Sequence, residues 1–185
     1  ALGLFQQITL SVTNGSSLLY QDAYIREADC HFMLKDFKQS LRMYDEVLNL
    51  NLTQADYALY QKAIIAGASN KTTEKIYLLQ SLPNRFPNSL LIADANMEIA
   101  NTYLADEKWI EAVPYLEKVL KDKKANSWYP QAYLKTGIAY FNLEKNTESL
   151  SFFKTLVVKY PNSPESDDAV EYIRKIFVED QKPGE

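Results

Sequence analysis

Hydrophobic residues recur at intervals of three and four along nearly the whole of this 185-residue chain. That spacing places apolar side chains on one face of an α-helix. Clusters of Gly, Pro, Asn and Ser interrupt the pattern every 12 to 18 residues and mark turns. The pattern predicts ten helices, at residues 2–12, 17–34, 37–50, 53–67, 71–84, 89–105, 108–121, 127–143, 146–160 and 165–179.

Two eleven-residue segments, 85–95 and 159–169, are near copies of each other. Both read basic residue, aromatic residue, Pro-Asn-Ser, four variable positions and Asp-Ala. They begin 74 residues apart (159 − 85), which is two periods of 37, and a fixed period in this range is typical of stacked repeat proteins. In each copy the Pro ends one helix, and the Ser that follows, Ser89 or Ser163, suits the N-cap of the next.

The same register places a small residue in every unit. These positions are spaced by 35, 37 and 37 residues, and close crossing of two helices needs a small side chain at the contact. The small residues are Ala28, Ala63, Ala100 and Gly137; sixteen residues further on lie Tyr44, Leu79, Leu116 and Phe153. The register therefore predicts four helix pairs.

This pattern resembles the tetratricopeptide repeat, a helix pair that begins with a large aromatic residue and ends with Pro. Tyr24 and Tyr133 hold the first aromatic position, whereas Leu59 and Asn96 depart from it. The resemblance implies an all-α fold: a right-handed α-α superhelix, or solenoid, of about ten antiparallel helices.

The register divides the chain into parts of one solenoid. We expect a half-repeat at 1–16, units at 17–52, 53–88, 89–126 and 127–163, and a terminal helix and tail at 164–185. Arg174 falls at the small-residue position of that last helix, which suits a helix with nothing stacked beyond it. The apolar face of Leu4, Phe5 and Ile8 looks like a second helix without its mate. We therefore expect a fragment of a longer chain, and self-association through the half-repeat.

Composition narrows the classes of function. The chain has a net charge of −4 and lacks a dense cluster of Lys and Arg, which argues against a nucleic-acid partner. No apolar run is long enough to insert into a membrane. The single cysteine, Cys30, cannot form an internal disulfide.

Catalytic chemistry is not apparent. His31 is the only histidine and follows Cys30 directly; neighbours on a helix point about 100° apart and cannot act as nucleophile and base. The sequence contains no Gly-rich phosphate loop, no metal-ligand spacing and no Ser-His-Asp set. Solvated helix surfaces account for the acidic pairs, such as Asp45 with Glu46. We expect no enzymatic activity, no cofactor and no metal.

The candidate site is a concave groove. In a stack of helix pairs, the first helices line the inner curve, and successive repeats extend it. Mixed apolar, aromatic, acidic and amide side chains there suit a peptide or a partner helix. The register places the following residues in the groove: Asp22, Ile25, Asp29, Phe32, Tyr57, Tyr60, Ile64, Asp94, Met97, Asn101, Leu104, Gln131, Leu134, Ile138 and Phe141.

Two alternatives to a binding groove stay open at this point. The repeats could be a structural spacer or scaffold within a larger protein, or the inward residues could pack against a neighbouring helix of a longer parent chain. The inward residues also argue against one known function of such grooves, the binding of a terminal carboxylate. Tetratricopeptide proteins that clamp a terminal carboxylate use Lys, Asn and Arg at inward positions, where this chain has Ile25, Asp29, Tyr60, Gln131 and Lys135.

The Pro-Asn-Ser boundary is similar to that of bacterial extracytoplasmic tetratricopeptide proteins. These include the periplasmic partner of the Tol–Pal system and the outer-membrane lipoprotein that aids β-barrel assembly. The resemblance implies a periplasmic or outer-membrane-associated location, with a cytoplasmic location as the alternative. No lipid-attachment cysteine supports it, because Cys30 falls within a predicted helix.

Overall fold

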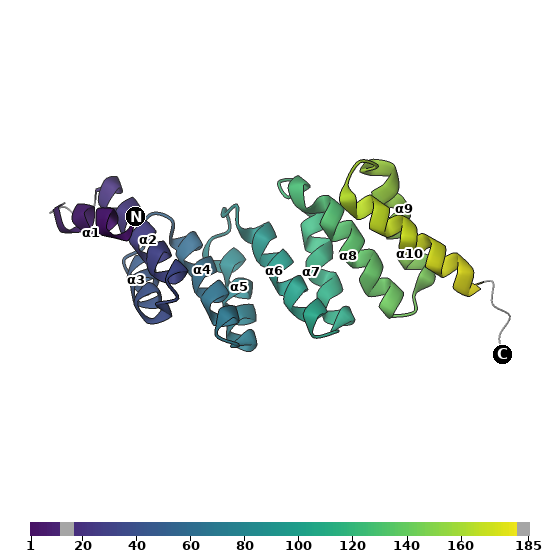
Figure 1. Cartoon of the computed structure of the whole chain (residues 1–185), viewed down its shortest axis with the longest axis horizontal. Helices are drawn as coiled ribbons and strands as arrows, with labels where there is room; N and C mark the ends of the chain where they lie inside the picture. Colours follow the sequence, from purple (N-terminus) through teal and green to yellow (C-terminus); the bar gives the residue numbers. More distant parts are fainter. Residues whose placement is uncertain (12–16, 181–185) are drawn as a thin grey trace. The chain divides into compact units, whose positions relative to one another are not determined.

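The computed structural model describes residues 1–11 and 17–180; for residues 179 and 180 it describes the backbone alone. Within these residues the chain forms ten α-helices, one 3-10 helix and no strand, so the all-α prediction is confirmed (Figure 1). The elements are α1 (Leu2–Ser11), α2 (Leu18–Met33), α3 (Phe37–Asn49), α4 (Ala55–Ala68), α5 (Thr72–Arg85), α6 (Ile92–Ala105), α7 (Trp109–Lys121), η1 (Asn126–Trp128), α8 (Tyr129–Asn142), α9 (Asn146–Lys159) and α10 (Pro164–Asp180).

The predicted helix ends agree closely with the observed ones, and the largest difference lies at the start of α6. The prediction placed that start at residue 89, three residues before Ile92. Residues 89–91 form a turn instead, in which the Leu91 N–H donates to the Ser89 hydroxyl over 3.1 Å. Ser89 is thus a turn residue rather than the direct N-cap of α6. The predicted turn at 14–17 lies outside the described residues except for Ser17, which caps α2 by accepting from the Tyr20 N–H, and the tail 181–185 lies outside them as well.

Each helix pair closes through the same turn. A non-glycine residue adopts the left-handed conformation, with φ between 55° and 60°, at four positions that share the register. The N–H of the next residue donates back into the preceding helix; for example, Asp36 donates to the carbonyl of His31 over 2.9 Å. This arrangement satisfies carbonyls at the end of the first helix. The four residues are Lys35, Asn70, Glu107 and Glu144.

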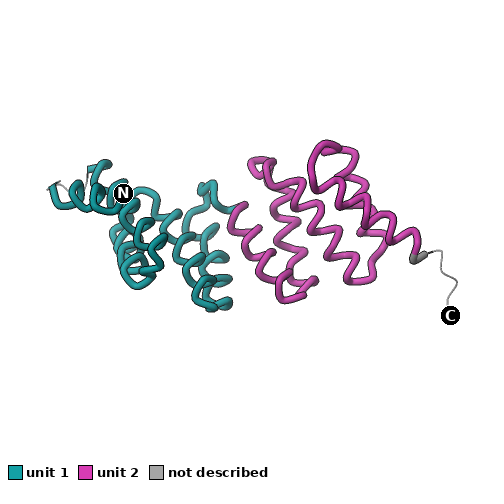
Figure 2. Tube along the Cα trace, viewed as in Figure 1, with its two compact units in different colours: residues 1–92 teal, residues 93–185 magenta. Residues whose placement is uncertain are grey.

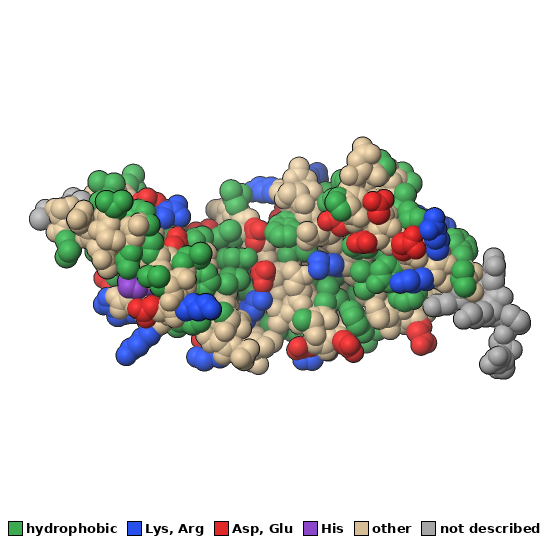
Figure 3. Space-filling model, viewed as in Figure 1, with side chains coloured by type: hydrophobic (Ala, Val, Ile, Leu, Met, Phe, Trp, Pro, Cys, Tyr) green, Lys and Arg blue, Asp and Glu red, His purple; other side chains and the backbone are tan. Residues whose placement is uncertain are grey.

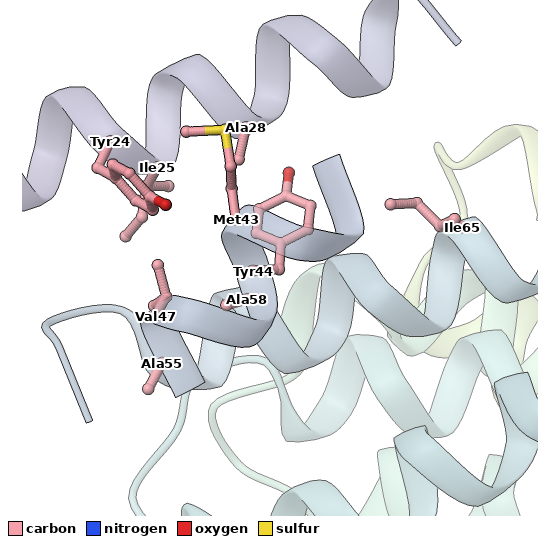
Figure 4. Packing of buried hydrophobic residues seen from close by; sticks show 9 residues of the cluster. All are labelled: Tyr24, Ile25, Ala28, Met43, Tyr44, Val47, Ala55, Ala58 and Ile65. Carbon is pink, nitrogen blue, oxygen red and sulfur yellow. The ribbon is translucent and has the colours of Figure 1, made fainter. Parts of the chain in front are cut away.

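The chain forms two compact units, residues 1–92 and 93–185 (Figure 2). In unit 1, α2, α3 and α4 enclose a core in which Ile25, Tyr44 and Val47 are completely buried (Figure 4). In unit 2, Leu116 and Val119 of α7 pack with α6 and α8. A further cluster around Phe153 and Leu156 joins α9 to α10. No described helix has the length and apolarity needed to cross a membrane.

The small residues of the register lie at the helix crossings, as predicted. Ala28, Ala63 and Ala100 are completely buried. Gly137 has the closest neighbour: a Cβ added there would lie 2.4 Å from the Phe153 ring. Hydroxyl groups also bridge two of the crossings, because Ser40 donates to the carbonyl of Ala28 and Ser149 to that of Gly137.

We expect Gly137→Ala to lower the free energy of unfolding by about 1–3 kcal/mol, because the new methyl group displaces a completely buried ring. Urea unfolding measures the loss. Replacing the ring by a smaller side chain, in the double variant Gly137→Ala with Phe153→Leu, should restore part of the lost stability. Gly3→Ala is the matched control, since its Cβ meets no atom within 4 Å. Equal stabilities for wild type and Gly137→Ala would contradict this account of the crossing.

Candidate functional site

The fifteen predicted groove residues all lie on first helices of their pairs, divided between the two units. Unit 1 carries Asp22, Ile25, Asp29 and Phe32 on α2, and Tyr57, Tyr60 and Ile64 on α4. Unit 2 carries Asp94, Met97, Asn101 and Leu104 on α6, and Gln131, Leu134, Ile138 and Phe141 on α8. Each unit is therefore described as a surface of its own.

Two of the fifteen belong to cores rather than to a surface. Ile25 is 0% exposed and Met97 is 1% exposed. They support the inner helices but cannot themselves touch a partner in this conformation. Asp22 and Gln131 are exposed, and the others are half-buried. Contact between these residues and a partner stays a prediction.

Asp29 is the centre of a hydrogen-bond network in unit 1. Its carboxylate accepts from the hydroxyl of Tyr44 over 2.6 Å and from that of Tyr57 over 3.1 Å. Arg26 contributes a third contact at 3.3 Å, and Gln61 donates to the Tyr57 hydroxyl over 2.7 Å. The network joins α2, α3 and α4, so Asp29 orients two tyrosines instead of offering a free charge to a ligand.

The network alters the titration of the tyrosines. Burial, and then the hydrogen bond to Asp29, raises the pKa of Tyr44 far above its ordinary value of 10.0. Burial and then the charge of Asp29 raise the pKa of Tyr57 in the same direction. Tyr24 behaves similarly, because its ring is largely buried and its hydroxyl donates to Glu46. All three prefer the neutral form in the folded protein.

Unit 2 has fewer polar contacts on its inner helices. The indole N–H of Trp128 donates to Asp94 over 3.1 Å, and Phe141 packs edge-on against Tyr172. Asn101 on α6 makes no such contact: its side-chain oxygen is buried and has no hydrogen-bond partner among the described residues. A buried acceptor without a donor costs about 1–3 kcal/mol. No hydrogen bond within the described chain offsets the burial of the Asn101 oxygen.

Side-chain hydrogen bonds also join successive helix pairs in unit 1. Gln21 of α2 accepts from both the N–H and the hydroxyl of Thr53, over 2.8 and 2.9 Å. One repeat later, Asp56 of α4 accepts from the hydroxyl of Ser89 over 2.5 Å. Sequence reasoning missed both contacts. The separations of 32 and 33 residues between the partners are close to the repeat period and could have indicated them.

An apolar hollow lies between α1 and α2, beside the half-repeat for which the sequence predicted self-association. It has a volume of about 480 Å³ and is lined by Leu2, Phe5, Cys30, Met33 and Leu34, with Arg26 and Asp29 at its rim. Hydrophobic side chains gather over α1 and α2 in the space-filling view (Figure 3). Sequence reasoning singled out Phe5 as part of an uncovered apolar face, but not Met33 and Leu34, which fall at the end of a predicted helix, outside the inward positions.

The described residues bring no set of metal ligands together. No set of three or more His, Cys, Asp or Glu side chains in the described part of the chain could hold a metal ion. Cys30 lines the apolar hollow, whereas His31 contacts Asp36. Among the acidic pairs, Asp45 forms an ion pair with Lys62 and Asp106 forms one with Lys108.

The tyrosine network predicts a fall in stability at alkaline pH. Above pH 10 the unfolded chain releases tyrosine protons that the folded chain retains, so the stabilisation is complete below pH 10 and declines as pH rises further. Each retained proton contributes a slope of about 1.4 kcal/mol per pH unit. We expect Tyr44→Phe to reduce the slope by one such increment in urea unfolding above pH 10. Tyr77→Phe, at an exposed ring, is the matched control. Equal slopes for wild type and Tyr44→Phe would refute the assignment.

Comparison with known proteins supports the repeat assignment. A family model of the tetratricopeptide repeat matches residues 57–89 and 131–163. No protein with a curated description matches the sequence significantly. Among solved structures, YrrB, described as a TPR protein with an unusual peptide-binding site, superposes with a TM-score of 0.64 at 17% identity, over 94% of this chain and 86% of that one.

Two structures of MamA show the same fold. MamA 41-end from Desulfovibrio magneticus RS-1 has a TM-score of 0.60 at 17% identity, covering 88% of this chain and 97% of its own. A MamA RS-1 ArsTM double mutant has a TM-score of 0.61 at 16% identity, covering 85% and 92%. The comparisons do not support the narrower resemblance to envelope proteins of the Tol–Pal type. The family model assigns residues 57–89 and 131–163 to tetratricopeptide repeats, and the solved structures show that the chain shares the fold of tetratricopeptide repeat proteins.

Proposed function

We propose that the chain is a non-catalytic protein-interaction module that binds a peptide or a partner helix along its first helices. The fold is one that serves protein–protein interaction, and a solved structure of similar fold is described as having a peptide-binding site. The half-buried aliphatic side chains of α8, such as Leu134 and Ile138, supply apolar contact area at the proposed surface of unit 2.

The observation that carries the proposal is the buried oxygen of Asn101. It has no donor among the described residues. Rotation of the half-buried side chain would turn this oxygen to the surface, where the backbone N–H of an extended peptide is a donor of the required kind. Leu104 lies one turn further along α6 and is half-buried, so an apolar side chain of the same peptide would find contact there. A spacer with no ligand would gain nothing from an unsatisfied acceptor at this place.

A location in the bacterial envelope is a separate proposal. Its support is the Pro-Asn-Ser boundary at residues 86–89 and 160–163 alone. Fractionation of the native host with an antibody against the chain tests it, and recovery in the cytoplasm would exclude it. The binding proposal does not depend on the result.

We expect Asn101→Leu to change binding and stability in opposite directions. Removal of the unsatisfied oxygen should raise the free energy of unfolding by about 1 kcal/mol, whereas peptides selected on the wild-type chain from a displayed random library should bind about tenfold more weakly. Calorimetric titration and urea unfolding measure the two effects. Leu134→Ala, on α8 of the same unit, should weaken the same peptides, and Asn49→Leu, at an exposed position of α3, is the matched control. Unchanged peptide affinity in Asn101→Leu combined with Leu134→Ala would refute the groove.

The exposed apolar face of α1 favours a second interaction, with another copy of the chain. The helix has no charged side chain and no buried residue, and Leu4 and Leu10 are 66% and 85% exposed. Two copies of an uncharged helix can pair without burying an unpaired charge. Large exposed apolar side chains continue onto the neighbouring α2, namely Leu18, Leu19 and Met33, with Leu34 directly after it.

The area available is close to what a stable dimer needs. Six such side chains offer about 100 Å² of apolar surface apiece, and each partner of a standard interface buries about 800 Å². One copy also supplies both the protruding leucines and the 480 Å³ hollow, which suits a symmetric interface in which the same patch serves both subunits. We therefore propose self-association of the chain through α1 and α2.

Sedimentation of the 185-residue chain tests self-association. We expect a dimer at concentrations of roughly 100 μM, and a monomer after Leu4→Lys with Leu10→Lys, because two charges would be buried in the interface. Val158→Lys, which changes an equally exposed side chain of unit 2, should leave the dimer intact. A wild-type monomer would exclude a second copy as the occupant of this face.

A further inference from the structure

Helix α10 continues the series of first helices in unit 2, after α6 and α8. Its Tyr172 packs edge-on against Phe141 of α8, with the ring centroids 5.4 Å apart. On the other side of α8, Ala132 shares a buried cluster with Met97 of α6. The three helices are therefore successive neighbours within one compact unit. The predicted groove residues stopped at α8, so α10 adds a part of the surface that sequence reasoning missed.

Each of these three helices carries an apolar side chain in its last turn, at the same position of the repeat. The side chains are Leu104 on α6, Phe141 on α8 and Val178 on α10, spaced by 37 residues. Leu104 and Phe141 are half-buried, and Val178 is 58% exposed. We call these three residues the apolar row. It gives a ligand three apolar contacts at a regular interval.

The distance between packed helices sets that interval, which is about 8–10 Å. In a β-strand, side chains on one face repeat about every 6.7 Å, and every second one of them about every 13 Å. Neither distance matches the row. A polyproline II segment has three residues per turn and a rise of about 3.1 Å per residue. Its residues i, i+3 and i+6 therefore point to one side and lie about 9 Å apart, which matches.

The buried acceptor of Asn101 separates this ligand from a partner helix. Residues seven apart on an α-helix also share a face and lie about 10.5 Å apart, so the interval alone does not exclude a helix. The N–H groups of a helix interior are bonded within the helix, however, whereas a polyproline II segment has no internal hydrogen bonds. Asn101 precedes Leu104 by three residues, and its side-chain oxygen has no partner among the described residues. A free backbone N–H beside the row would supply the missing donor.

We propose that unit 2 binds an extended segment in the polyproline II conformation, with an apolar side chain at every third position. The apolar row contacts these side chains, and Asn101, rotated to the surface, accepts from a backbone N–H next to Leu104. The residue that donates cannot be proline, which has no N–H. The ring of Phe141 at the centre of the row suits such a ligand, because polyproline II segments dock against aromatic side chains. This inference rests on the function proposed above and narrows its ligand to one conformation and one sequence period.

Peptides selected on the 185-residue chain from a displayed random library test the sequence period. The aligned peptides should carry apolar residues at i, i+3 and i+6. Apolar residues at every second position, or a spacing of seven in peptides that form helices, would overturn this inference and leave the binding surface of the proposed function intact. A library that yields no binding peptide would refute both.

Val178→Ala tests the contribution of α10, and the exposed position of this residue makes a folding defect small. The selected peptides should bind it roughly fivefold more weakly. On the wild type, an alanine in place of either outer apolar residue of the peptide should cost a similar factor; for the outer residue that faces Val178, the cost should largely disappear in Val178→Ala. Val158→Ala, at an exposed side chain of α9, is the matched control and should bind normally. Unchanged affinity in Val178→Ala, or equal costs of both peptide changes on wild type and variant, would overturn the assignment of the row.

Discussion

The close crossing of two helices within each pair is the constraint on which the rest of the structure depends. At the crossing of α8 and α9 no side chain larger than hydrogen fits, because Phe153 fills the space beside Gly137. At two other crossings an alanine shares a buried cluster with a large side chain, Ala28 with Tyr44 and Ala100 with Leu116. A buried serine hydroxyl bound to a backbone carbonyl, as in Ser149 to Gly137, further fixes two of the crossings. Once these contacts are set, the turn that joins the two helices has little freedom.

Much of the fold was predictable because this constraint is local and repeats. A small residue every 35 to 37 positions, with Pro and Ser at the boundaries, gives the order of the helices and most of their ends. The turns within pairs were less visible. Lys35, Asn70, Glu107 and Glu144 adopt the left-handed conformation at the same register, but none is a glycine, so residue type gave no signal. Spacing alone could have revealed them.

The site was harder to predict because it depends on contacts between helices distant in sequence. Register places Asp29 on an inward face, but its role is set by Tyr44 and Tyr57, 15 and 28 residues further along the chain. Ile25 and Met97 occupy nominally inward positions and still belong to cores. The helical period of 3.6 residues fixes the direction of each side chain, but the neighbouring helices decide whether that side chain is buried or exposed.

Specific function in such a repeat protein is expected where a residue departs from what the repeat requires. Packing explains Ala28 and Gly137 completely, and equivalent residues recur in every pair. It does not explain a buried oxygen at Asn101, or a buried nitrogen at His31 that faces a carboxylate. Each of these polar atoms costs stability in the isolated chain, and neither helix crossing needs it. The peptide contact proposed for Asn101 therefore rests on a polar group that the fold itself does not use.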